Sequence, residues 1–488
     1  MAWNDRAHYD SFYHLRGSPP AVEACRGTAC FLARHANPRR WSAACSQERK
    51  IYCLGKCYAA PAATDVEAAP EMRVNSPRAV ILERMVSGPV LTVDAYRRLQ
   101  GYVALEKALG SRPEDIVRAI EVSQLRGRGG AAYPTGVKWR AVMEQPDRPK
   151  YVVANADEGD AGAYVDRMIL ERDPQTLFEG MAIAAHAVGA SRGVIYLRSE
   201  YPQAQIVVAR ALEDARAEGI LGGKPLGTGH AFDIEIIVGH GSYVCGEETS
   251  MLNAIEGKRP EVRARPPYPT EAGLFGKPTL VNNVETLANV PWILRNGPEA
   301  YATLGFSKSR GTKVLSLNSL FQRPGLYEVE FGISLRRIVE DLGGGLRTGT
   351  LKGVIFGGPL AGVIPPRLLD TRLGFEELAA IGGAVGHGGV LAFDEHISIP
   401  DLVHHVFEFG AFESCGKCTP CRLGSRRIEK IFARAVAGDK MDAESKTELT
   451  DIVEALRWTS LCGHGTGLAA FAESVFRHYA KELSLCFA

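Results

Sequence analysis

The pattern of apolar residues over residues 114–198 predicts alternating helices and strands. Apolar residues recur at helical spacing in 114–125. A short apolar run over 151–155 predicts a strand that ends in polar residues, and a helix over 175–189 and a strand over 193–198 follow. This β-α-β rhythm is typical of an α/β layer.

The next stretch changes its pattern to alternating residues. The segments 312–318 and 325–330 alternate as strands do, and Arg-Pro-Gly between them supplies the turn. A helix over 335–342 and a strand over 353–356 complete a β-β-α-β order. This order suggests a small β-grasp domain.

From residue 399 onward the periodicity is helical. Four helices are expected, which would bury their apolar stripes against one another. They cover 401–410, 422–437, 443–458 and 466–482. By contrast, residues 59–75 are rich in Ala and Pro and lack periodicity, which predicts a linker.

Length and composition limit the function classes. A chain of 488 residues is too long for one core, and roughly three or four domains are expected. A net charge of +1 does not suit a nucleic-acid binder. The N-terminus lacks the apolar region of a secretory signal, and no apolar run reaches the length of a membrane span. The eleven cysteines are therefore expected to bind metal in the cytoplasm.

Three cysteines at two-residue intervals form the most specific motif. Cys415, Cys418 and Cys421 can converge on one corner of a cubane, and Cys462 is the candidate fourth ligand. Three thiolates plus a distant fourth match a [4Fe–4S] cluster. Zinc or buried free cysteines are the alternatives, but zinc prefers two paired hooks.

A second set, Cys25 with Cys30 and Cys53 with Cys57, offers two pairs of thiolates. Two ligands per iron suit a [2Fe–2S] cluster, and zinc is the competitor. The leftover Cys45 is expected to be a small buried residue. Residues 1–60 hold nine Lys/Arg against four Asp/Glu, which indicates either a solvated face or a docking surface for an acidic partner.

Five polar clusters lie between residues 125 and 286. Closely spaced glycines let the backbone approach a phosphate, and polar residues after a strand face the cleft where open α/β sheets bind ligands. Each cluster alone also suits a structural turn. The clusters are Gly127–Lys138, Asn155–Asp166, Gly239–Thr249, Arg265–Tyr268 and Asn282–Thr286. Cys245, inside the third, is expected to be a buried small residue.

Taken in this order, the five motifs and the cysteines resemble the flavoprotein subunit of respiratory complex I and its relatives, the diaphorase subunits of NAD-reducing hydrogenases and NAD-dependent formate dehydrogenases. The N-terminal cysteine loops resemble those of thioredoxin-like [2Fe–2S] ferredoxins, in an abbreviated form. The resemblance covers about residues 85–480. It implies that the following residues line an FMN and NADH cleft: Gly127, Arg128, Gly129, Gly130, Tyr133, Lys138, Asn155, Asp157, Glu158, Asp160, Tyr243, Gly246, Glu247, Glu248, Arg265, Tyr268, Asn282 and Asn283.

The chain departs from the family pattern at three places. Tyr133 stands where many members have Phe, Ala161 where a Pro is common, and Arg265 with Tyr268 where Lys with Phe is common. Ring stacking and charge survive these changes, so activity with altered affinity is expected. The Asp-Glu-Gly-Asp spelling of the acidic turn is closer to the hydrogenase and formate dehydrogenase relatives.

The resemblance implies a domain plan of class α/β. Its parts are an abbreviated thioredoxin-like [2Fe–2S] segment (1–65), a linker (66–84), a Rossmann-like FMN/NAD(H) domain (85–310), a β-grasp domain (311–396) and a helical [4Fe–4S] domain (397–488).

The expected function is electron transfer between NAD(H) and iron–sulfur clusters. NADH gives two electrons together and a cluster accepts one, so FMN is the required converter and no protein acid or base is demanded. Expected partners are ferredoxin-like iron–sulfur subunits and a hydrogenase, formate dehydrogenase or quinone-reducing module, with neither nucleic acid nor membrane insertion. The chain would work in the cytoplasm, free or on the cytoplasmic face of a membrane complex. The alternative is a non-catalytic docking subunit with structural zinc.

Overall fold

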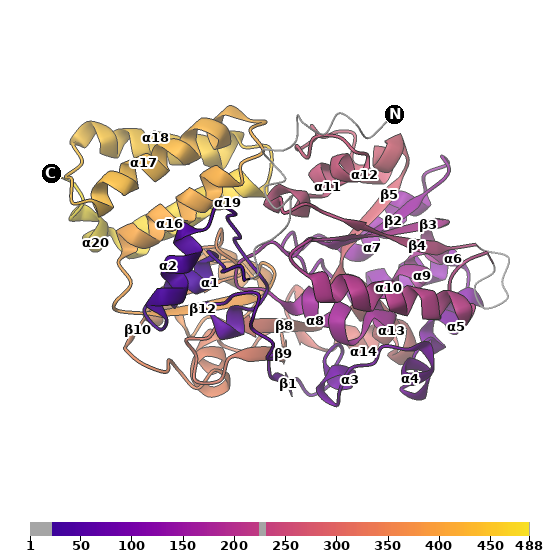
Figure 1. The fold of residues 1–488 in the computed structure, drawn as a ribbon. Coiled ribbons are helices and arrows are strands. Elements are labelled where there is room, and N and C mark those ends of the chain that lie inside the picture. The colour runs from indigo at the N-terminus through magenta and orange to yellow at the C-terminus, as the bar shows by residue number, and fades with distance from the viewer. Residues whose placement is uncertain (1–21, 224–230, 488) are drawn as a thin grey trace.

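A parallel sheet of four strands forms the centre of the computed structural model, which describes residues 22–223 and 231–487 (Figure 1). The strand order is β4-β3-β2-β5, and every pair is parallel. The strands are β2 (Tyr151–Ala156), β3 (Arg192–Leu197), β4 (Asp233–Val238) and β5 (Thr279–Asn283). The order runs outward from β2 in both directions, so β2 and β5 border a topological switch point.

Helices surround this sheet, as the β-α-β prediction requires. The helix α9 is buried along almost its whole length and packs against β2, β3 and α13. The helices of this part of the chain are α3 (Glu83–Val86), α4 (Val93–Arg98), α5 (Val103–Leu109), α6 (Pro113–Ser123), α7 (Thr135–Met143), α8 (Val165–Arg172), α9 (Pro174–Val188), α10 (Pro202–Ala217), α11 (Glu248–Ile255), α12 (Pro269–Ala272), α13 (Val284–Asn296) and α14 (Pro298–Ala302).

A second, mixed sheet of six strands has the order β1-β9-β8-β12-β10-β11. The strands are β1 (Met72–Asn75), β8 (Thr312–Leu317), β9 (Gly325–Glu330), β10 (Leu351–Phe356), β11 (Val363–Ile364) and β12 (Gly389–Asp394). β8 and β9 form an antiparallel hairpin, and a π-helical stretch over Arg337–Leu342 precedes β10. The predicted β-β-α-β order is present, and its assignment as a β-grasp domain stays an interpretation of that order.

The predicted linker over 66–84 is wrong as a structureless connection, because it contributes the edge strand β1. Met72 to Asn75 pair in parallel with Leu326 to Val329 of β9. Just beyond, the buried carboxylate of Glu328 accepts hydrogen bonds from the backbone N–H groups of residues 80–82. Most residues of β1 are exposed, so no alternation of apolar residues marks the strand in the sequence.

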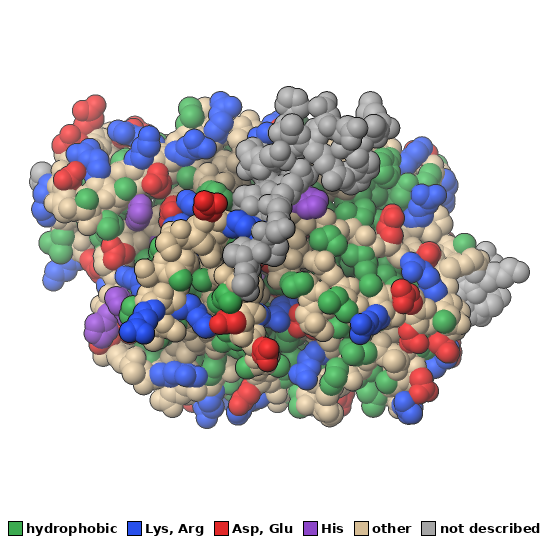
Figure 2. All heavy atoms as spheres, viewed as in Figure 1, with side chains coloured by type: hydrophobic (Ala, Val, Ile, Leu, Met, Phe, Trp, Pro, Cys, Tyr) green, Lys and Arg blue, Asp and Glu red, His purple; other side chains and the backbone are tan. Residues whose placement is uncertain are grey.

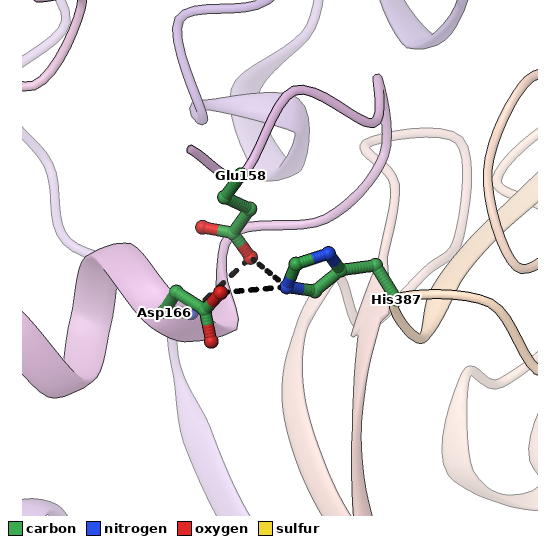
Figure 3. A group of neighbouring side chains, drawn as sticks. All are labelled: Glu158, Asp166 and His387. Atoms are coloured by element: carbon green, nitrogen blue, oxygen red, sulfur yellow. Dashed lines mark hydrogen bonds and ion pairs between the residues drawn. The ribbon is translucent and has the colours of Figure 1, made fainter. Parts of the chain in front are cut away.

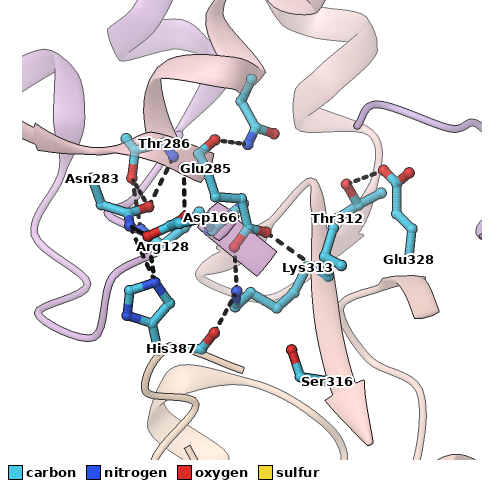
Figure 4. Close-up of polar contacts among 12 residues, drawn as sticks. Arg128, Asp166, Asn283, Glu285, Thr286, Thr312, Lys313, Ser316, Glu328 and His387 are labelled. Atoms are coloured by element: carbon cyan, nitrogen blue, oxygen red, sulfur yellow. Dashed lines mark hydrogen bonds and ion pairs between the residues drawn. The ribbon is translucent and has the colours of Figure 1, made fainter. Parts of the chain in front are cut away.

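A buried polar network joins the two sheets (Figure 4). Lys313 on β8 forms a salt bridge with Glu285 of α13, and both side chains are fully buried. Lys313 also donates to the carbonyl oxygen of His387, at 3.1 Å, and Glu285 accepts from the backbone N–H of Val314 at 3.0 Å. These contacts hold the 386–388 loop against the start of α13.

The C-terminal residues form the predicted helices, drawn in yellow and orange in Figure 1. They are α16 (Ile399–Phe412), α17 (Ser425–Val436), α18 (Ala443–Thr459), α19 (Gly463–His478) and the short α20 (Ala480–Ser484). α16 packs against α17 and α19, and α18 packs against α19.

The described part of the N-terminal segment, residues 22–65, consists of α1 (Thr28–Leu32), α2 (Pro38–Ser46), a 3₁₀ turn (Cys57–Ala59) and one isolated bridge between Ala24 and Ala63. Residues 1–21 of the predicted segment lie outside the described residues. With no strand in residues 22–65, the resemblance to thioredoxin-like ferredoxins does not extend to the fold of this part. Cys45 is exposed, contrary to prediction, because it lies on the outer face of α2.

The N-terminal segment docks on α16 of the same chain. Phe31 stacks on His405 with ring centroids 4.2 Å apart. Arg26 pairs with Glu408 at 2.8 Å, and Arg34 lies 3.3 Å from Asp401. An acidic partner for these basic residues thus lies within the chain itself.

Side chains of both charge signs are interspersed on the face shown in Figure 2, which agrees with the near-zero net charge. Within the two described ranges, no helix combines the length and the apolar character that a bilayer span requires.

Candidate functional site

A cavity of about 920 Å³ opens at the carboxyl ends of β2 and β5. This is the switch point of the parallel sheet, where open α/β sheets bind their ligands. Every predicted cleft residue except Arg128 and Glu158 lines it. These are Gly127, Gly129, Gly130, Tyr133, Lys138, Asn155, Asp157, Asp160, Tyr243, Gly246, Glu247, Glu248, Arg265, Tyr268, Asn282 and Asn283.

The glycine-rich loop lies against the end of β5. A Cβ atom at Gly129 would come within 2.8 Å of the Cβ of Asn283, and Gly130 has a φ of +113°. Among the described residues, the backbone N–H groups of Gly129 and Gly130 have no hydrogen-bond acceptor. Such free donors on a close-approaching backbone suit a phosphate.

Arg128 points away from the cavity, unlike the other residues of the glycine-rich loop that were predicted to line the cleft. The residue is only 1% exposed. Its guanidinium donates to the Tyr301 hydroxyl at 2.8 Å and to the carbonyl oxygen of Arg310 at 2.6 Å. The side chain therefore anchors the loop to the protein behind it.

One wall of the cavity carries paired charges. The Lys138 ammonium lies 3.0 Å from Glu248, and the Arg265 guanidinium lies 3.5 Å from the other oxygen of Glu248. Glu247 instead caps α11 by accepting from the N–H groups of residues 249 and 250. The rings of Tyr133 and Tyr268 are each 52% exposed on the cavity lining, where they can stack on a base.

The acidic turn after β2 supplies the opposite wall. Asn155 donates to the carbonyl oxygen of Gly246 at 2.8 Å, and the Tyr243 hydroxyl donates to Asp160 at 2.7 Å. The Oδ2 atom of Asp157 is buried without a partner among the described residues. Burial raises the pKa of Asp157 to about 8. An unpaired buried carboxyl oxygen facing a cavity indicates a site for a ligand's hydrogen-bonding group.

Glu158 lies behind this wall rather than on it, which corrects its predicted place. It is fully buried and accepts from the backbone N–H groups of Asp166 and Arg167 at the start of α8. His387 lies beside it, with Nε2 at 2.7 Å from Asp166 and 3.7 Å from Glu158 (Figure 3).

His387 lines the cavity and was missed in the sequence, where it is a lone histidine between glycines. Its carboxylate neighbours are more than 200 positions away, so only the run of glycines around it could have drawn attention to that loop.

The four C-terminal cysteines line one small cavity with Val244, Val262 and Leu461. A zinc ion with Zn–S bonds of about 2.3 Å would bring all four sulfurs to about 3.8 Å from one another. Among the described residues, however, no three cysteine sulfurs lie within 4.8 Å of one another. The wider spacing fits a cluster of several irons. Backbone N–H groups of Lys417 and Val262 point at the Cys415 sulfur, as thiolate ligands require.

The N-terminal cysteines Cys25, Cys30, Cys53 and Cys57 are all buried in one place. Cys25 lies within hydrogen-bonding reach of Cys30 and Cys53, and the sulfurs of Cys53 and Cys57 are 3.7 Å apart. Backbone N–H groups of residues 27, 55 and 62 point at three of the sulfurs. Among the described residues, no three of these sulfurs all lie within 4.8 Å of one another.

The cavity at the switch point and the C-terminal cysteine cavity share a wall. Val244, Cys462 and His464 line both. His464 contacts the carbonyl oxygen of Gly410 through Nε2 at 2.8 Å, and its ring lies 5.5 Å from that of Tyr243. Cys245, next to this wall, is buried as predicted, and burial raises its pKa.

Comparisons with known proteins agree with this geometry. The family described as the Nuo51 FMN-binding domain matches residues 120–292. The family described as the NADH-ubiquinone oxidoreductase-F iron-sulfur binding region matches residues 401–485.

Similar proteins span most of the chain. The NADP-reducing hydrogenase subunit HndC of Solidesulfovibrio fructosivorans is 43% identical over 392 residues, 80% of each chain. The F-type subunit of NADH-quinone oxidoreductase from Escherichia coli (strain K12) is 39% identical over 394 residues, 80% of this chain and 88% of that protein.

A solved structure described as the NAD⁺-reducing [NiFe]-hydrogenase in the H₂-reduced state covers 99% of this chain and 87% of its own, with a TM-score of 0.83 and 29% identity.

The matched regions contain the cavity at the switch point and the four C-terminal cysteines. The chain is an NADH dehydrogenase-type electron-transfer subunit that uses NAD(H), FMN and a [4Fe–4S] cluster. It belongs to the family of F-type flavoprotein subunits shared by NADH-quinone oxidoreductases and hydrogenase diaphorases.

Proposed function

We propose that this chain is the NAD(H)-reacting subunit of a multisubunit oxidoreductase and passes electrons through Cys415, Cys418, Cys421 and Cys462 to a partner subunit. The shared wall of Val244, Cys462 and His464 carries this proposal, because it puts the flavin cavity next to the cysteine cavity. When bound, FMN supplies the conversion between two-electron and one-electron transfer.

The residues of the protein bind the cofactor and the nucleotide and orient them toward each other. The glycine-rich loop offers backbone N–H groups to a phosphate, and the wall of Lys138, Glu248 and Arg265 is the place for the nicotinamide nucleotide. The apolar Val244 and Val262 line the cysteine cavity, which favours exclusion of water from the cluster.

The N-terminal cysteines are proposed to hold a [2Fe–2S] cluster as a side store or second exit. The burial of all four cysteines supports metal binding here, and a cluster is favoured over zinc because, in the described structure, no three of these sulfurs all lie within 4.8 Å of one another. The docking of the segment on α16 and on the acidic turn supports electron exchange within the chain.

The partners are proposed to be iron–sulfur subunits and a catalytic subunit of hydrogenase or formate dehydrogenase type. The relatives named for hydrogenases and the Asp157-Glu-Gly-Asp160 spelling support this choice over a quinone-reducing module. Affinity purification of the tagged full chain, with identification of the subunits that copurify, tests it. A quinone-reducing membrane complex as the companion would overturn it.

The electron route is tested with Cys418→Ser. The variant should lose the paramagnetic signal of the reduced cluster and the export of electrons. Bound FMN and its bleaching by NADH should remain, because Cys418 does not line the flavin cavity. Cys45→Ser is the matched control, since Cys45 is exposed and belongs to neither cysteine set. If Cys418→Ser keeps its full cluster content, Cys418 is not a cluster ligand. If the wild-type protein is colourless and contains structural zinc, the alternative of a non-catalytic docking subunit is favoured.

A further inference from the structure

Beside the glycine-rich loop lies a buried group of two carboxylates and one imidazole (Figure 3). Glu158 and Asp166 are fully buried, and the side chain of His387 is 9% exposed. Among these three, only His387 lines the cavity. The imidazole therefore separates the two carboxylates from whatever the cavity holds.

The contacts of the imidazole ring fix its orientation. Both carboxylates approach the same ring nitrogen, Nε2 (Figure 3). The carboxylate of Asp166 is itself held by Asn283 Nδ2 at 2.6 Å and by the backbone N–H of Glu285 at 3.2 Å (Figure 4). The second ring nitrogen, Nδ1, has no hydrogen-bond partner among the described residues, and His387 lines the cavity.

The same contacts set the charge of the ring. Burial alone would lower the pKa of His387, but the charge of Asp166, its hydrogen bond and the charge of Glu158 raise that pKa to about 9. At neutral pH both ring nitrogens then carry protons. Nδ1 is a charged hydrogen-bond donor in need of an acceptor.

Other donors lie on the loops that meet at His387. The glycine-rich loop, the 386–388 loop and the start of α13 converge here. A Cβ at Gly130 would lie 3.9 Å from the Cα of Gly386, and Asn283 Nδ2 lies 3.3 Å from His387 Nε2, on the carboxylate side of the ring. The backbone N–H groups of Gly129 and Gly130 have no acceptor among the described residues. Neutral amide donors plus one cation make a site for a phosphate.

The other cationic side chains near the glycine-rich loop are paired with other groups of the protein. The Arg128 guanidinium is turned away to Tyr301 and Arg310. The Lys138 ammonium is paired with Glu248 on the wall proposed for the nucleotide. His387 is thus the positive charge that the geometry makes available at the glycine-rich loop.

We propose that His387 is the cationic anchor of the FMN phosphate, and that Asp166 and Glu158 are positioning residues that hold it in place. A divalent metal at this group is disfavoured, because the carboxylate oxygens of Glu158 and Asp166 already accept protein N–H groups. The inference rests on FMN binding by this chain, and the test uses riboflavin to separate the two.

Riboflavin lacks the phosphate but keeps the isoalloxazine ring. The full chain is stripped of flavin, and quenching of flavin fluorescence measures its affinity for FMN and for riboflavin. His387→Gln keeps a similar size and removes the charge. The substitution should lower the affinity for FMN at least tenfold, because a charge-assisted hydrogen bond to the phosphate is lost. The affinity for riboflavin should change less than twofold. An unchanged ratio of the two affinities overturns the proposal.

Two further variants guard against a general structural effect. Lys138→Met removes a cation from the nucleotide wall and should leave the ratio of FMN to riboflavin affinity unchanged. Asp166→Asn should lower that ratio, since the ring loses its fixed charge partner. Equal weakening of FMN and riboflavin in all three variants would mean a structural role only. A divalent ion found by metal analysis of the wild type and lost in His387→Gln would also overturn the proposal.

The pH dependence gives a second readout. Asp166, Glu158 and Asp160 face the ring, while Lys313 contacts the His387 carbonyl and pairs with Glu285. The ratio of FMN to riboflavin affinity should hold between about pH 7 and 8 and fall above about pH 9 as the ring loses its proton. In His387→Gln the ratio should not change over this range; an identical fall in both proteins contradicts the assignment.

Discussion

Replacing Glu248 by Gln should shift the preference of the protein from NADH toward NADPH. Glu248 lines the cavity and is held by Lys138 at 3.0 Å and by Arg265 at 3.5 Å. A carboxylate on this wall accepts hydrogen bonds from ribose hydroxyls and repels the 2′-phosphate of NADP. The substitution keeps the shape of the side chain and removes the charge, and it frees Lys138 and Arg265 to contact that phosphate.

The magnitude follows from Coulomb's law with screening. The Glu248 side chain is 22% exposed, so at roughly 5 Å and an effective dielectric of about 40 it repels one phosphate charge by about 1.7 kcal/mol. The 2′-phosphate carries nearly two charges, and the two cations offset part of the repulsion. About 1.4 to 2.8 kcal/mol remains, which is about a tenfold to hundredfold change in the ratio of kcat/KM for NADPH to that for NADH.

The assay is steady-state reduction of a soluble dye, with kcat/KM measured for both nucleotides. Glu376→Gln is the matched control, because it removes one carboxylate from a salt bridge with Arg126 outside the cavity. High salt should shrink the effect of Glu248→Gln. If both activities fall in proportion and their ratio stays within twofold of wild type, Glu248 serves only to pair with its neighbours, and the electrostatic reasoning is refuted.

Three further outcomes are expected. Deleting residues 1–65 should remove two irons per chain; loss of one zinc and no iron would favour the structural alternative for Cys25, Cys30, Cys53 and Cys57. Lys313→Met should lower the free energy of unfolding in urea by about 3 to 5 kcal/mol, because Glu285 is left charged and buried, and adding Glu285→Gln should recover much of the loss. Asp157→Asn should stabilise the flavin-free protein increasingly from about pH 4 to 8 in thermal melts, since a pKa raised to about 8 means that the wild type loses stability as the pH rises through that range; a difference in Tm that does not depend on pH would contradict this.

The residues that sequence reasoning found share a local signature. The cysteines are recognisable by spacing, and the glycine-rich loop and acidic turn by composition. The loop and the turn line one cavity and the four C-terminal cysteines line the adjoining one, although only two strands of the parallel sheet, over 151–155 and 193–198, were predicted from the sequence. The direction in which a side chain points from a loop could not be predicted from such local patterns. Arg128 lies between two glycines of the motif, yet its side chain turns inward to Tyr301, 173 positions away.

Other features depend on contacts between distant parts of the chain. His387 becomes important only because Asp166 meets it across 221 positions. The strand β1 exists because β9 offers it an unpaired edge, and its exposed side chains leave no periodic trace. A repeat of apolar residues every 2 or every 3.6 positions shows that one face of a strand or helix is buried. Neither the contact of His387 with Asp166 nor the strand β1 depends on such a buried face.

The acidic turn over 157–162 has the flavin cavity on one side and the N-terminal cysteine loops on the other. Arg198 donates both to the carbonyl oxygen of Cys53 and to that of Glu158, and the N–H of Gly162 points at the Cys57 sulfur. The cluster proposed for the N-terminal cysteines and flavin in the cavity would therefore act on the same peptide segment from opposite sides. Thermodynamic linkage makes such a coupling reciprocal: whatever factor the loaded cysteines add to flavin affinity, bound flavin adds to metal retention. A cluster at the N-terminal cysteines, as proposed, and FMN in the cavity would then each change the affinity of the protein for the other by the same factor.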